Sequence, residues 1–241
     1  LMSTKFGPPS SGEVPVRLRQ NAFRTAAAMM VVAAGAVSAV AGAPSGRAEA
    51  PTHIAVIGDS YTAGSTEGGN GPRAWTEQAW KLLANRGVSI QADVAAEGGA
   101  GYGQPGSRGS VFQDLTARAV RRNDVLVVFF GSRNDQPVSP SEFPQLAAGT
   151  FHLARFAAPD ARVLVIGPPW PTATPPQAVL NIRNSLRSQA AAIGATFVDP
   201  IAENWFVGRP DLIGHDGVHP TDAGHAYMAE KIAPLIYSQL T

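Results

Sequence analysis

Residues 125–130 read Val125-Leu-Val-Val-Phe-Phe130, an apolar run without alternation between polar and apolar positions. A strand of this composition is typical of a parallel sheet that is covered on both faces. Val163-Leu-Val-Ile166 has the same character. Three further runs rich in β-branched or aliphatic residues predict strands at His53–Ile57, Val88–Val94 and Thr196–Val198.

Stretches with helical periodicity alternate with these strands. They are Trp75–Asn85, Val111–Val120, Ser141–Ala157, Gln177–Ile193 and Thr221–Leu240. The alternation predicts one α/β domain over residues 51–241, with a five-stranded parallel sheet covered by helices. Pro234 lies inside the last helical pattern, so we expect it to kink or end that helix.

Composition limits the chemistry that is open to this chain. Of its 241 residues 44% are hydrophobic and 15% charged, which is enough apolar material for a sizeable core. Nineteen basic against eighteen acidic residues give a formal charge of +1, which argues against a nucleic-acid-binding protein. Cysteine is absent, so disulfides, thiolate metal sites and a cysteine nucleophile are excluded. Serine, histidine and carboxylate side chains must therefore carry the chemistry.

The first fifty residues differ in composition from the rest of the chain. No charged residue occurs from Thr25 to Ala43, and arginines between positions 17 and 24 precede that stretch. This layout is typical of a secretory signal peptide, with cleavage expected between about Ala41 and Ala50. A retained membrane anchor is the competing interpretation, because a spanning helix needs roughly 20 apolar residues. The richness in alanine and glycine favours cleavage, so we interpret residues 1–50 as signal peptide and short linker of an exported protein.

Polar and glycine-rich segments follow the predicted strands. Ligands of open α/β sheets bind at the carboxyl ends of the strands, so these segments are the candidates for a functional site. They are Gly58–Gly64 after the first strand, Gly98–Gly103 after the second, Gly131–Asp135 after the third and His215–Pro220 before the last helix. We expect these four clusters to meet at one edge of the sheet.

Acyl transfer is the chemistry that the four clusters can share. Serine is a poor nucleophile unless a neighbouring base takes its proton and a third group orients that base. Ser60 lies where a nucleophile can project from a strand-to-helix turn, and His219 with Asp216 supplies a base and its orienting carboxylate. The backbone N–H groups of Ser60 and Gly99, with the side-chain amide of Asn134, would then form an oxyanion hole.

The clusters resemble the sequence blocks of the SGNH (GDSL-like) serine hydrolase family. Gly58-Asp59-Ser60-Tyr61 matches the first block, and the match carries the role of nucleophile to Ser60. The glycine of the second block falls on Gly99, with Gly98 and Gly101 as neighbouring alternatives. The resemblance implies a flavodoxin-like three-layer α/β/α sandwich and ester hydrolysis through an acyl-enzyme, without metal or other cofactor.

Of the two remaining blocks, the last matches in full and the third matches with one departure. The last block, Asp-x-x-His-Pro, is present at Asp216, His219 and Pro220. The third block is usually Gly-x-Asn-Asp, and Asn134 and Asp135 are matched, while an ungapped alignment places Ser132 where the family has glycine. Because of this departure, the resemblance does not determine the backbone shape beside Asn134 or the size of the pocket.

Two other classes of protein remain open at this point. A flavin- or nucleotide-binding module would use the hydroxyl-rich segment Ser60–Thr66 as a phosphate loop, although Asp59 places negative charge beside it. A non-catalytic module that binds carbohydrate is the second alternative, and the intact serine, histidine and aspartate argue against it. An α/β-hydrolase would show Gly-x-Ser-x-Gly around its nucleophile, whereas Thr62 takes the place of the second glycine.

The expected substrate is an ester, either a small molecule or a cell-envelope component such as a lipid or an acetylated sugar. We expect membrane or cell-wall proximity and no nucleic-acid partner. Asp59 is expected to cap the turn, and His215 and His225 to be surface or supporting residues rather than metal ligands. Three aromatic residues follow the fourth and fifth strands and either line a pocket or pack in the core: Trp170, Trp205 and Phe206.

Overall fold

A computed structural model describes residues 50–241, and the signal peptide predicted before them lies outside the described residues. Five strands form one sheet in the order β2-β1-β3-β4-β5, and every neighbouring pair is parallel. The strands are β1 (Thr52–Gly58), β2 (Ile90–Ala96), β3 (Leu126–Phe130), β4 (Arg162–Ile166) and β5 (Thr196–Val198). The predicted five-stranded parallel sheet is confirmed.

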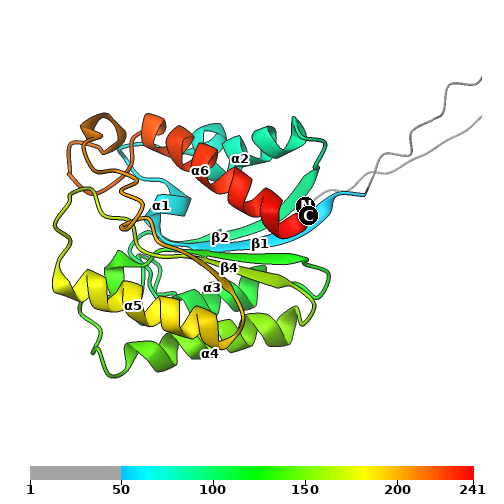
Figure 1. Cartoon of the computed structure of the whole chain (residues 1–241), viewed down its shortest axis with the longest axis horizontal. Helices are drawn as coiled ribbons and strands as arrows, with labels where there is room; N and C mark the ends of the chain where they lie inside the picture. Colours follow the sequence, from blue (N-terminus) through cyan, green and yellow to red (C-terminus); the bar gives the residue numbers. More distant parts are fainter. Residues whose placement is uncertain (1–49) are drawn as a thin grey trace, which may run out of the picture. The chain divides into compact units, whose positions relative to one another are not determined.

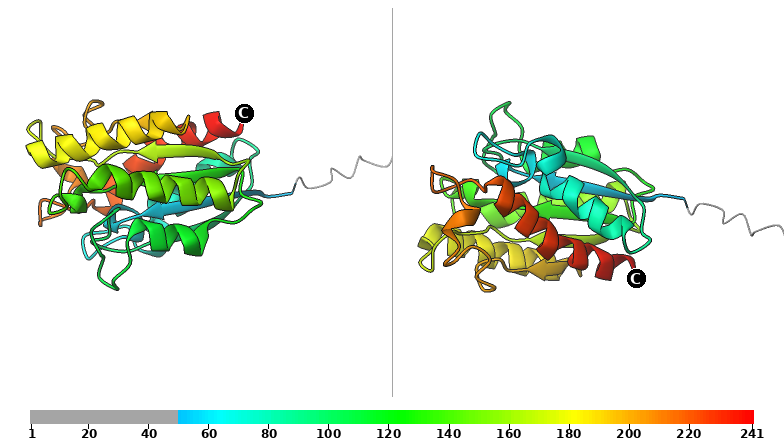
Figure 2. Two further views of the ribbon diagram at one scale, coloured as in Figure 1. Left: turned by 90° about the horizontal axis from the view of Figure 1, so that it is seen from below. Right: turned by 90° about the horizontal axis from the view of Figure 1, so that it is seen from above.

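Helices cover both faces of this sheet and complete a three-layer α/β/α sandwich (Figure 1). One layer contains α3 (Phe112–Ala119), α4 (Phe143–Ala157) and α5 (Gln177–Ala192), and the other contains α2 (Trp75–Ala84) and α6 (Asp222–Leu240). Figure 2 shows the first layer from below and the second from above. Four short helical segments lie in the connections: α1 (Ser60–Ala63), η1 (Gly71–Arg73), η2 (Arg133–Asp135) and η3 (Pro210–Leu212).

The central strand β3 explains why its sequence does not alternate. All five of its residues are buried. Val127 and Phe129 join the core cluster beneath α3, α4 and α5, while Val128 and Phe130 join the cluster beneath α2 and α6. Successive side chains of a strand point to opposite faces, so a strand between two helical layers needs apolar residues at every position.

The second strand lies two residues further along the chain than the sequence predicted. The expectation was Val88–Val94, whereas β2 spans Ile90–Ala96. Because β2 is an edge strand, its burial is incomplete and Val94 is 41% exposed, which weakens the apolar pattern that marks the strand. The observed end of β2 places Glu97, Gly98 and Gly99 immediately after the strand, at the edge where the other clusters lie.

Pro234 was expected to kink or end the last helix, and it does not end it, because α6 continues beyond it to Leu240. Proline removes one backbone hydrogen bond, but tertiary packing of an apolar face contributes most of the stability of protein helices. Ile232 and Ile236, on either side of the proline, are both fully buried against the sheet. None of the helices within residues 50–241 is long and apolar enough to cross a membrane.

Candidate active site

The turn after β1 presents Ser60. β1 ends at Gly58, and Asp59 is the N-cap of α1, with its Oδ1 accepting the backbone N–H of Tyr61 at 2.9 Å. This confirms the capping role expected of Asp59. A Cβ at Gly58 would lie 2.3 Å from Oγ1 of Thr62, so only glycine allows the helix to begin so close to the strand. Ser60 itself is 8% exposed.

The carboxyl group of Asp59 is buried beside this turn. Burial raises its pKa to about 7, although the Tyr61 N–H and the positive charge of Arg133 act to lower it. Its second oxygen, Oδ2, lies 3.4 Å from Nδ2 of Asn134. A group that changes charge near neutral pH therefore lies between the serine turn and the Asn134 amide.

His219 and Asp216 form a pair in the loop before α6. Nδ1 of His219 lies 2.5 Å from Oδ2 of Asp216, and Oδ1 of Asp216 accepts the backbone N–H groups of Val218 at 2.8 Å and His219 at 2.9 Å. Partial burial acts to raise the pKa of Asp216, but the hydrogen bond from the His219 side chain and the two backbone N–H groups outweigh it and lower the pKa to about 2. Asp216 is thus a carboxylate that fixes the imidazole and leaves Nε2 on its other side.

A hydrogen bond joins the serine turn to the histidine loop. The hydroxyl of Tyr61, the residue after Ser60, donates to the backbone carbonyl of Val218, the residue before His219, at 2.5 Å. These two residues are 157 positions apart in the sequence. Ser60 Oγ itself makes no hydrogen bond to any group of residues 50–241.

The loop after β2 lies against Ser60. A Cβ built on Gly98 would be 4.0 Å from Cβ of Ser60, and Gly99 has a positive φ of 80°, a conformation that favours glycine. Within the described part of the chain, the backbone N–H groups of Ser60 and Gly99 donate to no other group. Two unpaired N–H groups are therefore present beside the serine, as an oxyanion hole requires.

Glu97 holds this loop, and sequence reasoning missed it. Its side chain is fully buried, and Oε1 accepts the backbone N–H groups of Arg108 and, at 3.2 Å, Ser110. The loop between Gly98 and Ser110 is thereby closed on the end of β2. A charged residue directly before the glycine pair was the available signal, but its burial is a tertiary property.

Asn134 and Asp135 tie the second cluster to the third. Nδ2 of Asn134 donates to the carbonyl of Ala100 at 2.9 Å. Asp135 accepts the backbone N–H groups of residues 102, 103 and 104, each at 2.8 Å, and the hydroxyl of Ser132. Ser132, which stands at the family's glycine position, is fully buried and adds a donor to this network. The departure in the third block is thus accommodated without displacing Asn134 from the cluster.

Other residues singled out in the sequence lie around this cluster. Trp205 and Phe206 are each 1% exposed and pack in the core, whereas Trp170 is partly exposed. His225 is fully buried rather than at the surface, and its Nδ1 accepts the backbone N–H of Trp75 at 3.3 Å. Burial lowers the pKa of His225 to about 4. His225 lies in the first turn of α6 and bonds to the start of α2, so it supports the fold rather than facing solvent.

The structure thus brings all four predicted clusters to the carboxyl edge of the sheet, in the connections opposite the C-terminus (Figure 1). The sequence profile of the GDSL-like lipase/acylhydrolase family matches residues 56–227, which span every one of them. The chain belongs to this family. A GDSL lipase of Mycobacterium tuberculosis is 63% identical over 190 residues, covering 78% of this chain and 82% of that protein.

Solved structures of low sequence identity share the fold of this GDSL-like chain. The crystal structure of TesA is 22% identical with a TM-score of 0.64, and covers 78% of this chain and 99% of the other. The lipase/acylhydrolase from Enterococcus faecalis is 18% identical with a TM-score of 0.62, and covers 78% and 96%. The family assignment confirms the resemblance seen in the sequence, and makes the chain a carboxylic ester hydrolase rather than a non-catalytic binding module.

Proposed function

We propose that this GDSL-like hydrolase is an exported serine esterase that cleaves its substrate through an acyl-enzyme, with Ser60, His219 and Asp216 as the catalytic triad. The carrying observation is the 2.5 Å contact between Nδ1 of His219 and Asp216, which leaves Nε2 as the base. The Tyr61–Val218 hydrogen bond supports the pairing of this base with the serine turn.

In the first half of the reaction, Oγ of Ser60 attacks the ester carbonyl carbon while its proton passes to Nε2 of His219. The tetrahedral intermediate collapses when the C–O bond to the alcohol breaks, and His219 gives the proton to the departing oxygen. Water then attacks the acyl-enzyme while His219 takes its proton. The bond between the acyl carbon and Oγ of Ser60 breaks, the acid leaves, and His219 returns the proton to Oγ. Asp216, ionised because its pKa is lowered to about 2, stabilises the imidazolium in both halves.

The oxyanion of each tetrahedral intermediate is held by three donors in this proposal. The backbone N–H groups of Ser60 and Gly99 are unpaired within the described residues, so they are ready to donate. Asn134 supplies its amide, whose second hydrogen faces Asp59 at the longer distance of 3.4 Å and can turn to an oxyanion. Losing one such donor costs on the order of 10² to 10³ in rate.

Export is proposed from the composition of residues 1–50, whose uncharged stretch after a group of arginines is typical of a signal peptide. The protein would then meet its substrate at the cell envelope or outside it, close to a membrane or the cell wall. Lipid esters and acetylated sugars are the cell-envelope esters that fit such a location.

The decisive experiment is the hydrolysis of a chain-length series of 4-nitrophenyl esters by the protein and by its Ser60→Ala variant. We expect turnover to vanish in the variant while circular dichroism stays unchanged. Ser65→Ala is the matched control, because its hydroxyl lies on the same connection and accepts the Glu67 N–H at 3.1 Å. A fluorophosphonate probe should label Ser60 alone, as read by peptide mass spectrometry. Turnover retained in Ser60→Ala would show that another residue is the nucleophile.

A further inference from the structure

Arg133 occupies the variable position of the third block, between Ser132 and Asn134. Its guanidinium carbon lies 4.1 Å from the centre of the Trp170 ring, so the two planes are in contact. Arg133 follows β3 and Trp170 follows β4, which are neighbours in the sheet. The indole Nε1 donates to Oγ1 of Thr172 at 3.1 Å, which fixes the ring that supports the guanidinium.

Arg133 has no direct ion-pair partner among the described residues, although the buried carboxyl of Asp59 feels its charge. Nη1 of Arg133 is buried without a hydrogen-bond partner within residues 50–241. A buried donor left unsatisfied costs about 1–3 kcal/mol, and arginine cannot escape this cost by losing its proton. The side chain as a whole is partly exposed, so an anion from outside the protein can approach it.

The charge of Arg133 also acts on the two residues that flank Ser60 in the sequence. Burial raises the pKa of Asp59 to about 7 and that of Tyr61 to about 12, and in both cases the charge of Arg133 acts in the opposite direction. Asp59 and Tyr61 flank Ser60 in the sequence, so Arg133 acts on the groups on either side of the nucleophile. Tyr61 is neutral at physiological pH and Asp59 is only partly ionised, so neither supplies a full counter-charge.

A groove of about 410 Å³ begins beside Trp170 and reaches the histidine loop. Pro171, Phe206 and Ile213 give it apolar walls, and the ring of Phe206 packs edge-on against Tyr61 with centroids 6.1 Å apart. Arg209 also lines this groove, but its guanidinium is already held by both carboxylate oxygens of Asp211, at 3.1 and 2.9 Å. Unlike Arg209, Arg133 forms no ion pair with an acid of residues 50–241.

We propose that Arg133 is a specificity-determining residue that binds an anionic group, a carboxylate or a phosphate, carried by the ester substrate. The inference rests on the proposed function and names a substrate class for it. A guanidinium that lies over an indole keeps its positive charge and its in-plane N–H donors, which are the groups that bind carboxylates and phosphates. Anionic esters are then preferred over neutral esters of the same size.

Two matched pairs of substrates test this preference. Mono-4-nitrophenyl adipate and 4-nitrophenyl hexanoate differ by a carboxylate on the acyl part, and hexanoylglycerol 3-phosphate and hexanoylglycerol differ by a phosphate on the alcohol part. We expect the protein to favour the anionic member of one pair in kcat/KM. Arg133→Gln should lower that anionic-to-neutral ratio about 10- to 100-fold, in line with the loss of charge-assisted hydrogen bonds.

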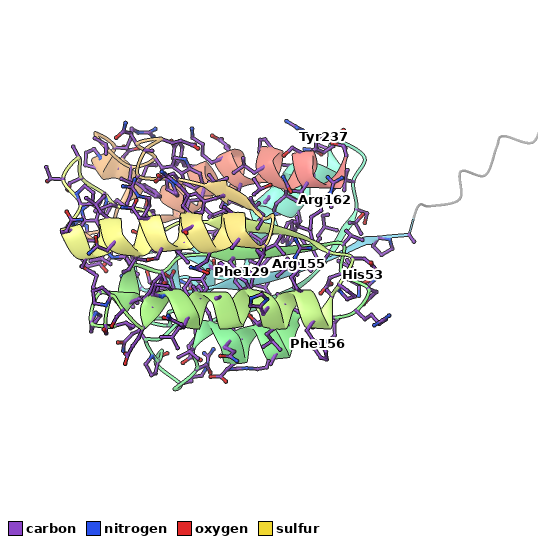
Figure 3. All side chains as sticks on the ribbon, turned by 60° about the horizontal axis from the view of Figure 1, so that its bottom comes forward. His53, Phe129, Arg155, Phe156, Arg162 and Tyr237 are labelled. Atoms are coloured by element: carbon purple, nitrogen blue, oxygen red, sulfur yellow. The ribbon has the colours of Figure 1, made fainter. Side chains whose placement is uncertain are left out.

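Three further variants separate recognition from general effects. Arg133→Lys keeps the charge without the planar fork, so it should restore only part of the ratio. Trp170→Leu removes the support of the guanidinium and should also lower the ratio. Arg162→Gln removes one positive charge at the start of β4, at the opposite end of the sheet (Figure 3), and should leave the ratio unchanged.

The outcomes distinguish this inference from the proposed function. Ratios near one in the protein, or equal ratios in the protein and Arg133→Gln, would overturn the inference while serine-dependent ester hydrolysis stands. If no ester is hydrolysed, the proposed function fails. The anion site is then tested separately, by calorimetric measurement of adipate and glycerol 3-phosphate binding to Ser60→Ala. Binding that disappears in the Ser60→Ala/Arg133→Gln double variant supports the site, and absence of binding of both ligands overturns it.

Discussion

Replacing Asp59 by asparagine should stabilise the protein relative to the parent, and this gain should grow as the pH rises from acidic to neutral. The Asp59 carboxyl is 1% exposed, and its Oδ1 accepts the backbone N–H of Tyr61 at 2.9 Å. Asparagine keeps the shape of the side chain and an oxygen for this N–H. What it removes is the proton equilibrium of a buried acid.

The size of the effect follows from linkage between ionisation and folding. Burial raises the pKa of Asp59 from 3.8 to about 7, which corresponds to about 4 kcal/mol because each pKa unit is worth about 1.36 kcal/mol. Below the pKa of Asp59 in the unfolded state, the carboxyl is protonated in both the folded and the unfolded parent, so its ionisation does not change the free energy of unfolding. As pH rises toward the folded value the unfolded state releases its proton first, so the parent loses stability that the variant keeps.

Urea unfolding followed by tryptophan fluorescence at intervals from pH 4 to pH 8 measures this difference. The free-energy gap between Asp59→Asn and the parent should move in favour of the variant by about 4 kcal/mol over that range. Any unfavourable contact between the new asparagine amide and Asn134 shifts this free-energy gap by the same amount at every pH. Asp160→Asn, which removes an exposed carboxyl in the turn before β4, is the matched control and should follow the parent at every pH.

Stability curves of the parent and Asp59→Asn that stay parallel from pH 4 to pH 8 would refute the reasoning. They would mean that the carboxyl is hydrated in the native state or is paired with a cation, such as Arg133, more strongly than its surroundings indicate. A gap that moves in favour of the parent as pH rises would show that the ionised form is the stabilised one.

Two further predictions concern catalysis. In kcat/KM measured from pH 4.5 to pH 9, ester hydrolysis should rise from acidic to neutral pH, because a histidine acts as a general base only in its neutral form. Asp216 should give no inflection, because its pKa is lowered to about 2 and it is already ionised. The rise should persist in Asp59→Asn, and a flat profile would exclude His219 as the base. Asn134→Ala should lower kcat by about 10² to 10³ with a smaller change in KM, because its amide acts on the oxyanion. Gln136→Ala, on the same turn, should change kcat less than about threefold, and equal losses in both variants would count against Asn134 as an oxyanion donor.

The sequence predicts the architecture because the relevant signals are local. Val127 and Phe129 face one helical layer and Val128 and Phe130 the other, so an unbroken apolar run indicates a buried parallel strand before any contact is known. Parallel strands bring their carboxyl ends to one edge, which is why the clusters around Ser60 and His219 could be expected to meet there.

Several features of the site could not be predicted in this way. Glu97 gives no sequence signal of its role, and Asp135 gives only its place in the third block; their burial and their backbone N–H partners show that they organise the glycine loop. Pro234 is read as a helix breaker from its chemistry, whereas packing of α6 on the sheet overrides that preference. His225 gives no sequence signal that separates a buried histidine from an exposed one.

The sequence by itself determined the strands, the helices and the order of the four clusters, since these follow from periodicity and residue type over short stretches. Only the tertiary structure decided that Tyr61 bonds to Val218, that Asp59 is buried with a raised pKa, and that Arg133 lies over Trp170 without an ion-pair partner among the described residues. These features depend on the exclusion of water and on contacts between residues far apart in the chain, which local patterns do not encode.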